Sequence, residues 1–220
     1  MNVVFYSMPL GPNPEIFWEV ADVAASPEEG VITTIGGKET AGRFVRLVRY
    51  EHGQQQMVLQ RVNTIALADP SGGTCHRMDV LVLAVILFTS DDLCVLRRQL
   101  NPPDEVGPSV TAFLNPSDFD GVRRLSQFDP LRSVCEELGV RRHQVKRVHV
   151  MGLIRAVQHD EAPMLMYRGH LNVSSGQLRS QAPRGVDLVF ADVLSVDTFP
   201  KRSASLDDLL TLLVREDMGR

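Results

Sequence analysis

The chain has 220 residues, a formal net charge of −4 and an apolar fraction of 44%. This length allows one large domain, or a core domain with a smaller appendage, and the near-average composition excludes a disordered tail. The acidic balance argues against an extended nucleic-acid surface, which needs an excess of Lys and Arg on one face.

The cysteines and the longest apolar run indicate the compartment. Cys75, Cys94 and Cys135 have no C-x-x-C spacing, which favours neither a disulfide framework nor a zinc site. The first residues lack the basic region of a secretory signal. Residues 80–88 form the longest apolar run, nine residues long, whereas a membrane helix needs about 20. We therefore expect a cytoplasmic protein with no membrane partner.

Residues 1–73 are predicted to form a small β-rich region. Its β-prone runs are residues 3–7, 31–35, 43–50 and 56–62. The last two flank Glu51-His52-Gly53, which suits a hairpin turn. The turn residues Asp69-Pro70-Ser71-Gly72-Gly73 then mark a boundary, so we expect a second domain over residues 77–216.

The second domain is predicted to alternate strands with helices. Residues 80–88 are almost wholly apolar, as in a strand buried on both faces. Residues 101–121 hold four prolines and two glycines and predict a loop. The other expected strands are residues 93–97, 148–157, 164–173 and 187–196. A helix over residues 205–215 closes the chain, with Ser205 and Asp208 at the spacing of a capping box.

A helix expected over residues 129–138 carries the most informative pattern. Asp129 suits the N-cap and Gly139 a left-handed stop. At about 100° per residue, Glu136 and Glu137 fall together on the face opposite the apolar stripe. Two adjacent carboxylates on such a face could share a Mg²⁺ ion, which prefers oxygen ligands and often brings phosphates with it.

The segment Arg132-Ser133-Val134-Cys135-Glu136-Glu137-Leu138-Gly139-Val140 resembles the second half of the Nudix box, G-x5-E-x7-R-E-U-x-E-E-x-G-U, where U is aliphatic. Eight of its nine positions agree with the pattern, two of them unconstrained. The order of the expected elements over residues 77–216 is also similar to a Nudix domain. The resemblance implies an α/β fold: a Nudix-like α/β/α sandwich with a mixed β-sheet, preceded by the small β-rich N-terminal region.

The family hydrolyses nucleoside diphosphates linked to another group, with Mg²⁺ or Mn²⁺ held by helix glutamates. The resemblance therefore implies Glu136 and Glu137 as metal ligands. Arg123 and Arg124 precede the helix, where a diphosphate lies in a Nudix-like site. With Arg132 they are the candidate ligand-binding arginines. The pairs Arg97–Arg98 and Arg141–Arg142 are interpreted as surface residues.

Two glutamates of the family pattern are missing. Ser133 stands at the glutamate after the box arginine, and Arg124 stands at the upstream glutamate. Serine cannot supply a negative charge near neutral pH, and loss of a general base costs about 10²–10⁴ in rate. Asp118, Asp120 or the pair Asp160–Glu161 could supply another acid. Glu161 is the candidate favoured by the resemblance, because family members often recruit an acid from that later loop.

Three functions remain open, and no residue is assigned as catalytic. The first is a Nudix-like module that binds a nucleotide or diphosphate-containing ligand, or a protein partner, with weak or no hydrolysis. The second is a Mg²⁺- or Mn²⁺-dependent hydrolase of a nucleoside diphosphate derivative. The third is a non-catalytic structural or assembly subunit. The missing glutamates favour the first. The N-terminal strands resemble those of the ADP-ribose pyrophosphatase branch, which implies a homodimer.

Overall fold

The computed structural model describes residues 14–19, 33–35, 38–40, 44–51, 54–62, 80–99, 104–154 and 162–218. These residues fall into two compact units. The first draws on Met1–Val82, Phe113–Phe128 and Leu153–Met164, and the second on Leu83–Ala112, Asp129–Gly152 and Leu165–Arg220. The boundary expected at residues 69–73 lies outside the described residues, as does the β-prone run at 3–7.

The first unit contains a three-stranded sheet in the order β1-β5-β4. Its strands are β1 (Glu15–Glu19), β4 (Phe44–Glu51) and β5 (Gln56–Val62). β5 pairs parallel with β1 and antiparallel with β4, so the sheet is mixed. A two-stranded sheet consists of β2 (Thr33–Ile35) and β3 (Lys38–Thr40). The strands expected near residues 43–50 and 56–62 are confirmed, and the pairing of Glu51 with Gln56 agrees with the expected hairpin.

Aromatic contacts connect β1 to the later segment of the first unit. Trp18 meets the ring of Phe119 edge-on, with ring centroids 6.0 Å apart, and Phe119 stacks on Phe128 at 4.9 Å. Phe119 belongs to the 3-10 helix η2 (Pro116–Phe119), which is followed by η3 (Leu125–Gln127). Because each such pair adds to the burial of its rings, residues distant in sequence hold this part of the core together.

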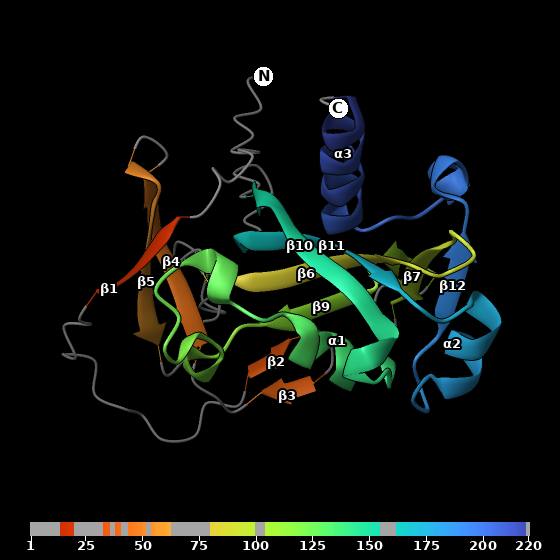
Figure 1. Cartoon of the computed structure of the whole chain (residues 1–220), viewed down its shortest axis with the longest axis horizontal. Helices are drawn as coiled ribbons and strands as arrows, with labels where there is room; N and C mark the ends of the chain where they lie inside the picture. The colour runs from red at the N-terminus through yellow and green to blue at the C-terminus, as the bar shows by residue number, and fades with distance from the viewer. Residues whose placement is uncertain are drawn as a thin grey trace, which may run out of the picture. The chain divides into compact units, whose positions relative to one another are not determined.

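A seven-stranded sheet forms the larger part of the second unit (Figure 1). Its main path is β10-β11-β6-β7-β12, with β8 paired to β7 and β9 paired to β6. The strands are β6 (Val82–Phe88), β7 (Cys94–Arg98), β8 (Val106–Gly107), β9 (Val110–Phe113), β10 (Val145–Ile154), β11 (Met164–Leu171) and β12 (Leu188–Ala191). All seven residues of β6 are buried, which confirms the strand buried on both faces.

The loop expected over residues 101–121 is wrong in part, because this segment holds β8, β9 and η2. A buried serine explains the difference. The Ser109 hydroxyl accepts the backbone N–H of Leu87 at 2.8 Å and donates to the carbonyl of Val95, so it bridges β6 and β7. Pairing with these central strands makes the segment extended despite its prolines, because strand formation depends on tertiary context more than on propensity.

Two further elements differ from expectation. The strand expected over residues 187–196 ends at Ala191, and the 3-10 helix η5 (Val193–Thr198) follows. The helix α2 (Ser175–Gln181) was not predicted, although the Ser174 side chain accepts the backbone N–H of Gln177 in a capping box. That spacing is a readable start signal, and it was overlooked.

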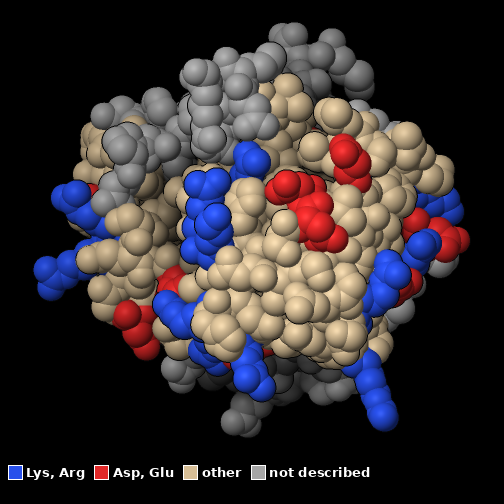
Figure 2. Space-filling model, turned by 45° about the vertical axis from the view of Figure 1, so that its right-hand side comes forward, with Lys and Arg blue, Asp and Glu red and all other residues tan. Residues whose placement is uncertain are grey.

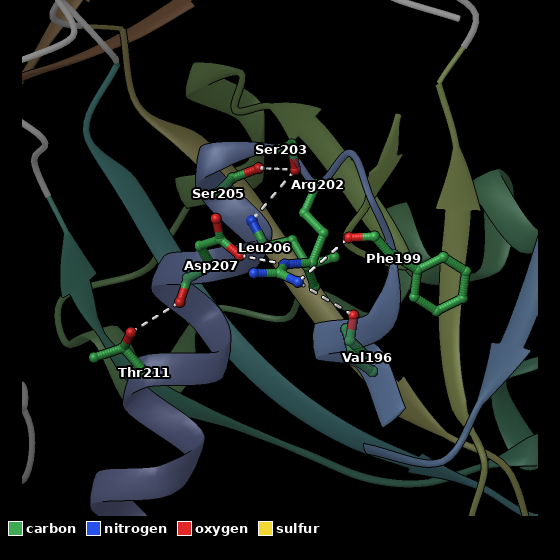
Figure 3. A network of polar contacts seen from close by, with 8 residues as sticks. All are labelled: Val196, Phe199, Arg202, Ser203, Ser205, Leu206, Asp207 and Thr211. Carbon is green, nitrogen blue, oxygen red and sulfur yellow. Dashed lines mark hydrogen bonds and ion pairs between the residues drawn. The ribbon is translucent and has the colours of Figure 1, made fainter. Parts of the chain in front are cut away.

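The last helix, α3 (Ala204–Met218), is anchored at its first turn (Figure 3). The Ser203 hydroxyl accepts the backbone N–H of Leu206 at 3.3 Å, so Ser203 is the capping residue and the cap expected at Ser205 is wrong. Arg202 donates from Nε to the Asp207 carboxylate at 2.6 Å and from Nη1 to backbone carbonyls of η5 and the residue after it. These bonds fix the start of α3 against the preceding 3-10 helix.

The expected mixed α/β class, with a mixed β-sheet and an N-terminal β-rich segment, is confirmed. The remaining helices in the described part of the chain are α1 (Leu131–Leu138) and the 3-10 helix η4 (Arg142–Gln144). Within the described part of the chain, no helix has both the length and the apolar character needed to span a bilayer.

Candidate functional site

Helix α1 carries the acidic pair and forms close to where it was expected. It starts two residues later than predicted, and Pro130 occupies the N-cap expected at Asp129. The Asp129 carboxylate nevertheless accepts the backbone N–H of Leu131, the first residue of the helix, at 3.0 Å. Gly139 ends the helix with φ of 68°, in the left-handed region. A Cβ at this position would lie 2.9 Å from the carbonyl oxygen of Gln181, so the helix end also packs tightly against α2.

The two faces of α1 are as expected. Val134 and Leu138 are completely buried, whereas Glu136 and Glu137 lie on the other side. The two glutamates have different surroundings, because the Glu136 side chain is 65% exposed and that of Glu137 only 26%. Cys135 is partly buried, and burial raises the pKa of its thiol, which disfavours the reactive thiolate.

Glu137 is bound by an arginine from the neighbouring sheet. Arg97 Nη1 lies 2.6 Å from Glu137 Oε2, and about three quarters of each side chain is shielded from water. Such a charge-assisted contact is stronger than a hydrogen bond between neutral groups, and a guanidinium keeps its charge at any physiological pH. The interpretation of Arg97 as a surface residue is therefore wrong, because this side chain compensates the charge of Glu137.

Glu136 has a partner on its own helix. Arg132 Nε donates to Glu136 Oε1 at 3.0 Å, one turn earlier. Both side chains are about two thirds exposed, and exposed pairs with this spacing contribute only about 0.3–0.5 kcal/mol. Arg132, a candidate for ligand binding, thus holds Glu136 in a contact that costs little to open.

A third ion pair lies at the start of the helix. Arg142 Nη1 is 2.6 Å from Asp129 Oδ2, with side chains 71% and 45% exposed. Asp129 is thereby engaged twice, by the backbone N–H of Leu131 and by a residue in η4. Three acids of this segment, Asp129, Glu136 and Glu137, are thus each bound by an arginine.

The described side chains do not fit the divalent ion that the family resemblance implies. Among residues that the structure describes, no group of three His, Cys, Asp or Glu side chains could hold a metal ion. Ser133 stands beside the two glutamates where the family pattern has a third. Asp118 accepts the backbone N–H of Asn115 at 2.8 Å, as a local cap. Asp160–Glu161 lies outside the described residues.

Arg123 and Arg124 belong to the first unit. Both backbone N–H groups donate to the side chain of Gln127, at 2.9 and 3.1 Å. The guanidinium of Arg124 lies 2.9 Å from the carboxylate of Glu15 on β1, and both side chains are about half exposed. This solvated pair ties the segment before α1 to the edge of the three-stranded sheet.

Charges of both signs occur on the surface. The face drawn in Figure 2 carries several groups of Lys and Arg side chains beside a compact group of acidic ones. Basic side chains are therefore gathered in local groups on that face.

No protein-family model matches the chain, and no curated protein matches it. Solved structures do resemble it. DR0079 from Deinococcus radiodurans is 16% identical with a TM-score of 0.48, covering 79% of this chain and 97% of that one. Tm1382, described as a proposed Nudix hydrolase, is 11% identical with a TM-score of 0.47, covering 62% and 70%. The C. elegans Ap4A hydrolase is 10% identical with a TM-score of 0.39, covering 63% and 96%. The solved structures that this chain resembles thus include Nudix hydrolases, the family that its helix motif resembles.

Proposed function

We propose that the chain is a Nudix-like protein that binds a nucleotide or another diphosphate-containing ligand, with weak or no hydrolysis. One observation carries the proposal: both glutamates of the helix motif are bound by arginines. Glu137 pairs with Arg97 and Glu136 with Arg132. The third acid of the family pattern is replaced by Ser133.

The ion pairs weaken the case for hydrolysis. A divalent ion on the helix would have to displace the shielded guanidinium of Arg97 from Glu137. It would then have two carboxylates, whereas Mg²⁺ and Mn²⁺ are held in octahedral oxygen shells. Without a bound ion, neither stabilisation of the transferring phosphoryl group nor activation of water is supplied. The expected turnover is therefore orders of magnitude below that of a complete site.

The same arrangement supports binding of a diphosphate. A guanidinium presents a fork of N–H donors that matches phosphate oxygens. Arg132 is held by an exposed pair with Glu136, and a diphosphate can replace that carboxylate at the cost of a few tenths of a kcal/mol. Arg132 is thus the residue of the helix best able to exchange an internal acid for a ligand.

Binding and turnover are measured separately to test the proposal. Thermal unfolding is followed with ADP-ribose, a nucleoside diphosphate sugar or a dinucleotide, with and without Mn²⁺, and product release is assayed in the same samples. We expect stabilisation without turnover, because a ligand at 100 times its Kd stabilises the fold by about 2.7 kcal/mol. Turnover that disappears in Glu136→Gln/Glu137→Gln would instead establish a hydrolase. Absence of any stabilisation would leave a structural or assembly subunit.

A further inference from the structure

Four basic side chains lie on one face of the seven-stranded sheet, within the second unit. Arg147 and His149 are two residues apart on β10, and Arg168 and His170 are two residues apart on β11. Residues with this spacing in a strand point to the same face. A Cβ on Gly169, between Arg168 and His170, would lie 3.0 Å from the side chain of Val148, between Arg147 and His149. Gly169 and Val148 therefore share one face, and both basic pairs lie on the other.

An aromatic ring from β6 lies under two of these side chains. The His170 imidazole stacks on Phe88, with centroids 5.4 Å apart and ring planes 25° apart. The Arg168 guanidinium carbon lies 5.0 Å from the centroid of the same ring. Phe88 itself is only 6% exposed. It therefore fixes the position of the Arg168 guanidinium and the His170 imidazole, and a guanidinium over an aromatic face keeps its charge.

The residues between these positions confirm the alternation. A Cβ on Gly169 would lie 2.6 Å from the side chain of Leu87 and 3.0 Å from that of Val148. Leu87, Val148 and Gly169 therefore share the opposite face, each being the chain neighbour of a residue in the basic group.

Among the described residues, three basic side chains and one acid act on His170, and this imidazole has an unfilled hydrogen-bonding position. Burial is the main reason why the pKa of His170 is lowered. The positive charges of Arg147, Arg168 and His149 lower it further, whereas the charge of Asp92 raises it. The Nε2 atom of His170 is buried and has no hydrogen-bond partner among the described residues. A buried polar atom without a hydrogen-bond partner destabilises the folded state. An anion on this face would supply both a counter-charge and a hydrogen-bond acceptor.

We propose that this basic face, comprising Phe88, Arg147, His149, Arg168 and His170, binds a small phosphate-bearing anion. Guanidinium groups suit phosphate oxygens because of their forked donors. The basic side chains of this face are confined to β10 and β11, and the chain as a whole is acidic, with a net charge of −4. These features suit a compact phosphate or diphosphate, whereas a nucleic acid needs an extended basic surface. The face contains no residue of the helix site, so the inference does not depend on the proposed function.

The test measures binding of inorganic pyrophosphate to the full chain by calorimetry. Arg147→Gln removes an exposed charge from the basic face, and Arg168→Gln removes the charge over Phe88. Lys146→Gln is the matched control, because it removes one exposed positive charge from the same strand and its side chain points to the opposite face. We expect each arginine variant to weaken binding about tenfold, with Lys146→Gln unchanged and all thermal midpoints within a few degrees of the wild type.

A second readout identifies the place of binding. In an NMR titration, pyrophosphate should raise the pKa of His170, since a nearby anion favours the imidazolium form. Three outcomes would overturn the inference: no binding of pyrophosphate to the wild type, an equal loss in Lys146→Gln, or binding of an RNA oligonucleotide without binding of pyrophosphate. If nucleotide binding is lost in Arg132→Gln but pyrophosphate binding persists, the helix site and the basic face are separate. Loss of pyrophosphate binding in Arg147→Gln and Arg168→Gln, with nucleotide binding unchanged, supports the basic face alone.

Discussion

The guanidinium of Arg97 lies 2.6 Å from the carboxylate of Glu137, and this contact joins strand β7 to helix α1. The two residues are 40 positions apart in the chain. Only about a quarter of each side chain is open to water. An acid that the helix motif assigns to a metal ion is thus balanced by a permanent cation of the chain itself.

Arg97→Gln should destabilise the fold by about 1–3 kcal/mol, because it leaves a partly buried carboxylate without its charged partner. Urea unfolding at neutral pH measures the loss. Arg98→Gln is the control, since Arg98 is 41% exposed and pairs with solvated acids, and its effect should stay below about 0.5 kcal/mol. The double variant Arg97→Gln/Glu137→Gln should recover part of the loss. Equal losses of stability in Arg97→Gln and Arg98→Gln would show that the contact between Arg97 and Glu137 has no special role.

Ser133→Glu should create a divalent-ion site, because it places a third carboxylate on the exposed side of α1 beside Glu136 and Glu137. We expect Mn²⁺ affinity to rise at least about tenfold over the wild type, a gain of 1.4 kcal/mol. Calorimetry measures it, and Ser133→Gln controls for side-chain size without charge. A Ser133→Glu variant that binds Mn²⁺ no better than Ser133→Gln would show that the helix face cannot assemble a metal centre.

The turn between β6 and β7 should stabilise the fold in a pH-dependent way. The Asp91 carboxylate accepts the N–H of Ser175 at 2.9 Å and its hydroxyl at 2.7 Å. Hydrogen bonds from Thr89 and Ser175 lower the pKa of Asp91 from 3.8 to about 2. A lowered acid pKa means that the stabilisation is complete above pH 3.8 and is lost as the pH falls through about 2.

Asp91→Asn should accordingly lower the unfolding midpoint in urea at neutral pH, and the difference from wild type should shrink toward pH 2. Asp104→Asn serves as the comparison, because its side chain is 74% exposed and its contact with Arg98 is long, at 3.4 Å. A difference between Asp91→Asn and wild type that stays constant from neutral to acid pH would rule out the ionised carboxylate as the cause.

Gly139→Ala should be more harmful than Gly121→Ala. Both glycines have a positive φ, 68° and 74°, which costs an L-residue about 1–2 kcal/mol. A Cβ at Gly121 meets nothing within 4 Å, whereas one at Gly139 lies 2.9 Å from the Gln181 carbonyl oxygen. Chemical unfolding should therefore show a larger loss for Gly139→Ala. Equal losses would mean that the junction of α1 and α2 adjusts freely.

The elements predicted correctly are those whose signals are local. β6 follows from one uninterrupted apolar run, and α1 from its left-handed stop and its two faces. β8 and β9 have no such signal, since they are extended by pairing with distant central strands and by the hydroxyl of Ser109. The helix α2 did carry a signal, the capping box of Ser174 and Gln177.

The site was predictable only as far as one helix determines it. The spacing of Glu136 and Glu137 places both opposite the buried stripe, and Glu136 is exposed there as expected, whereas Glu137 is only 26% exposed because it packs against Arg97. The partner of Glu137 comes from another strand, and a pair of adjacent arginines does not reveal which of them turns toward the helix. The basic face was missed for the same reason, because its members come from three strands and meet only when β6, β10 and β11 are adjacent in the sheet.

The central claim is that the two helix carboxylates are held by arginines and do not form a divalent-ion centre. Electron paramagnetic resonance of Mn²⁺, titrated into the wild type and into Glu136→Gln/Glu137→Gln, tests it most directly. We predict that the two proteins give the same signal of free aqueous Mn²⁺ at every concentration. A bound Mn²⁺ signal in the wild type that disappears in the double variant would contradict the account.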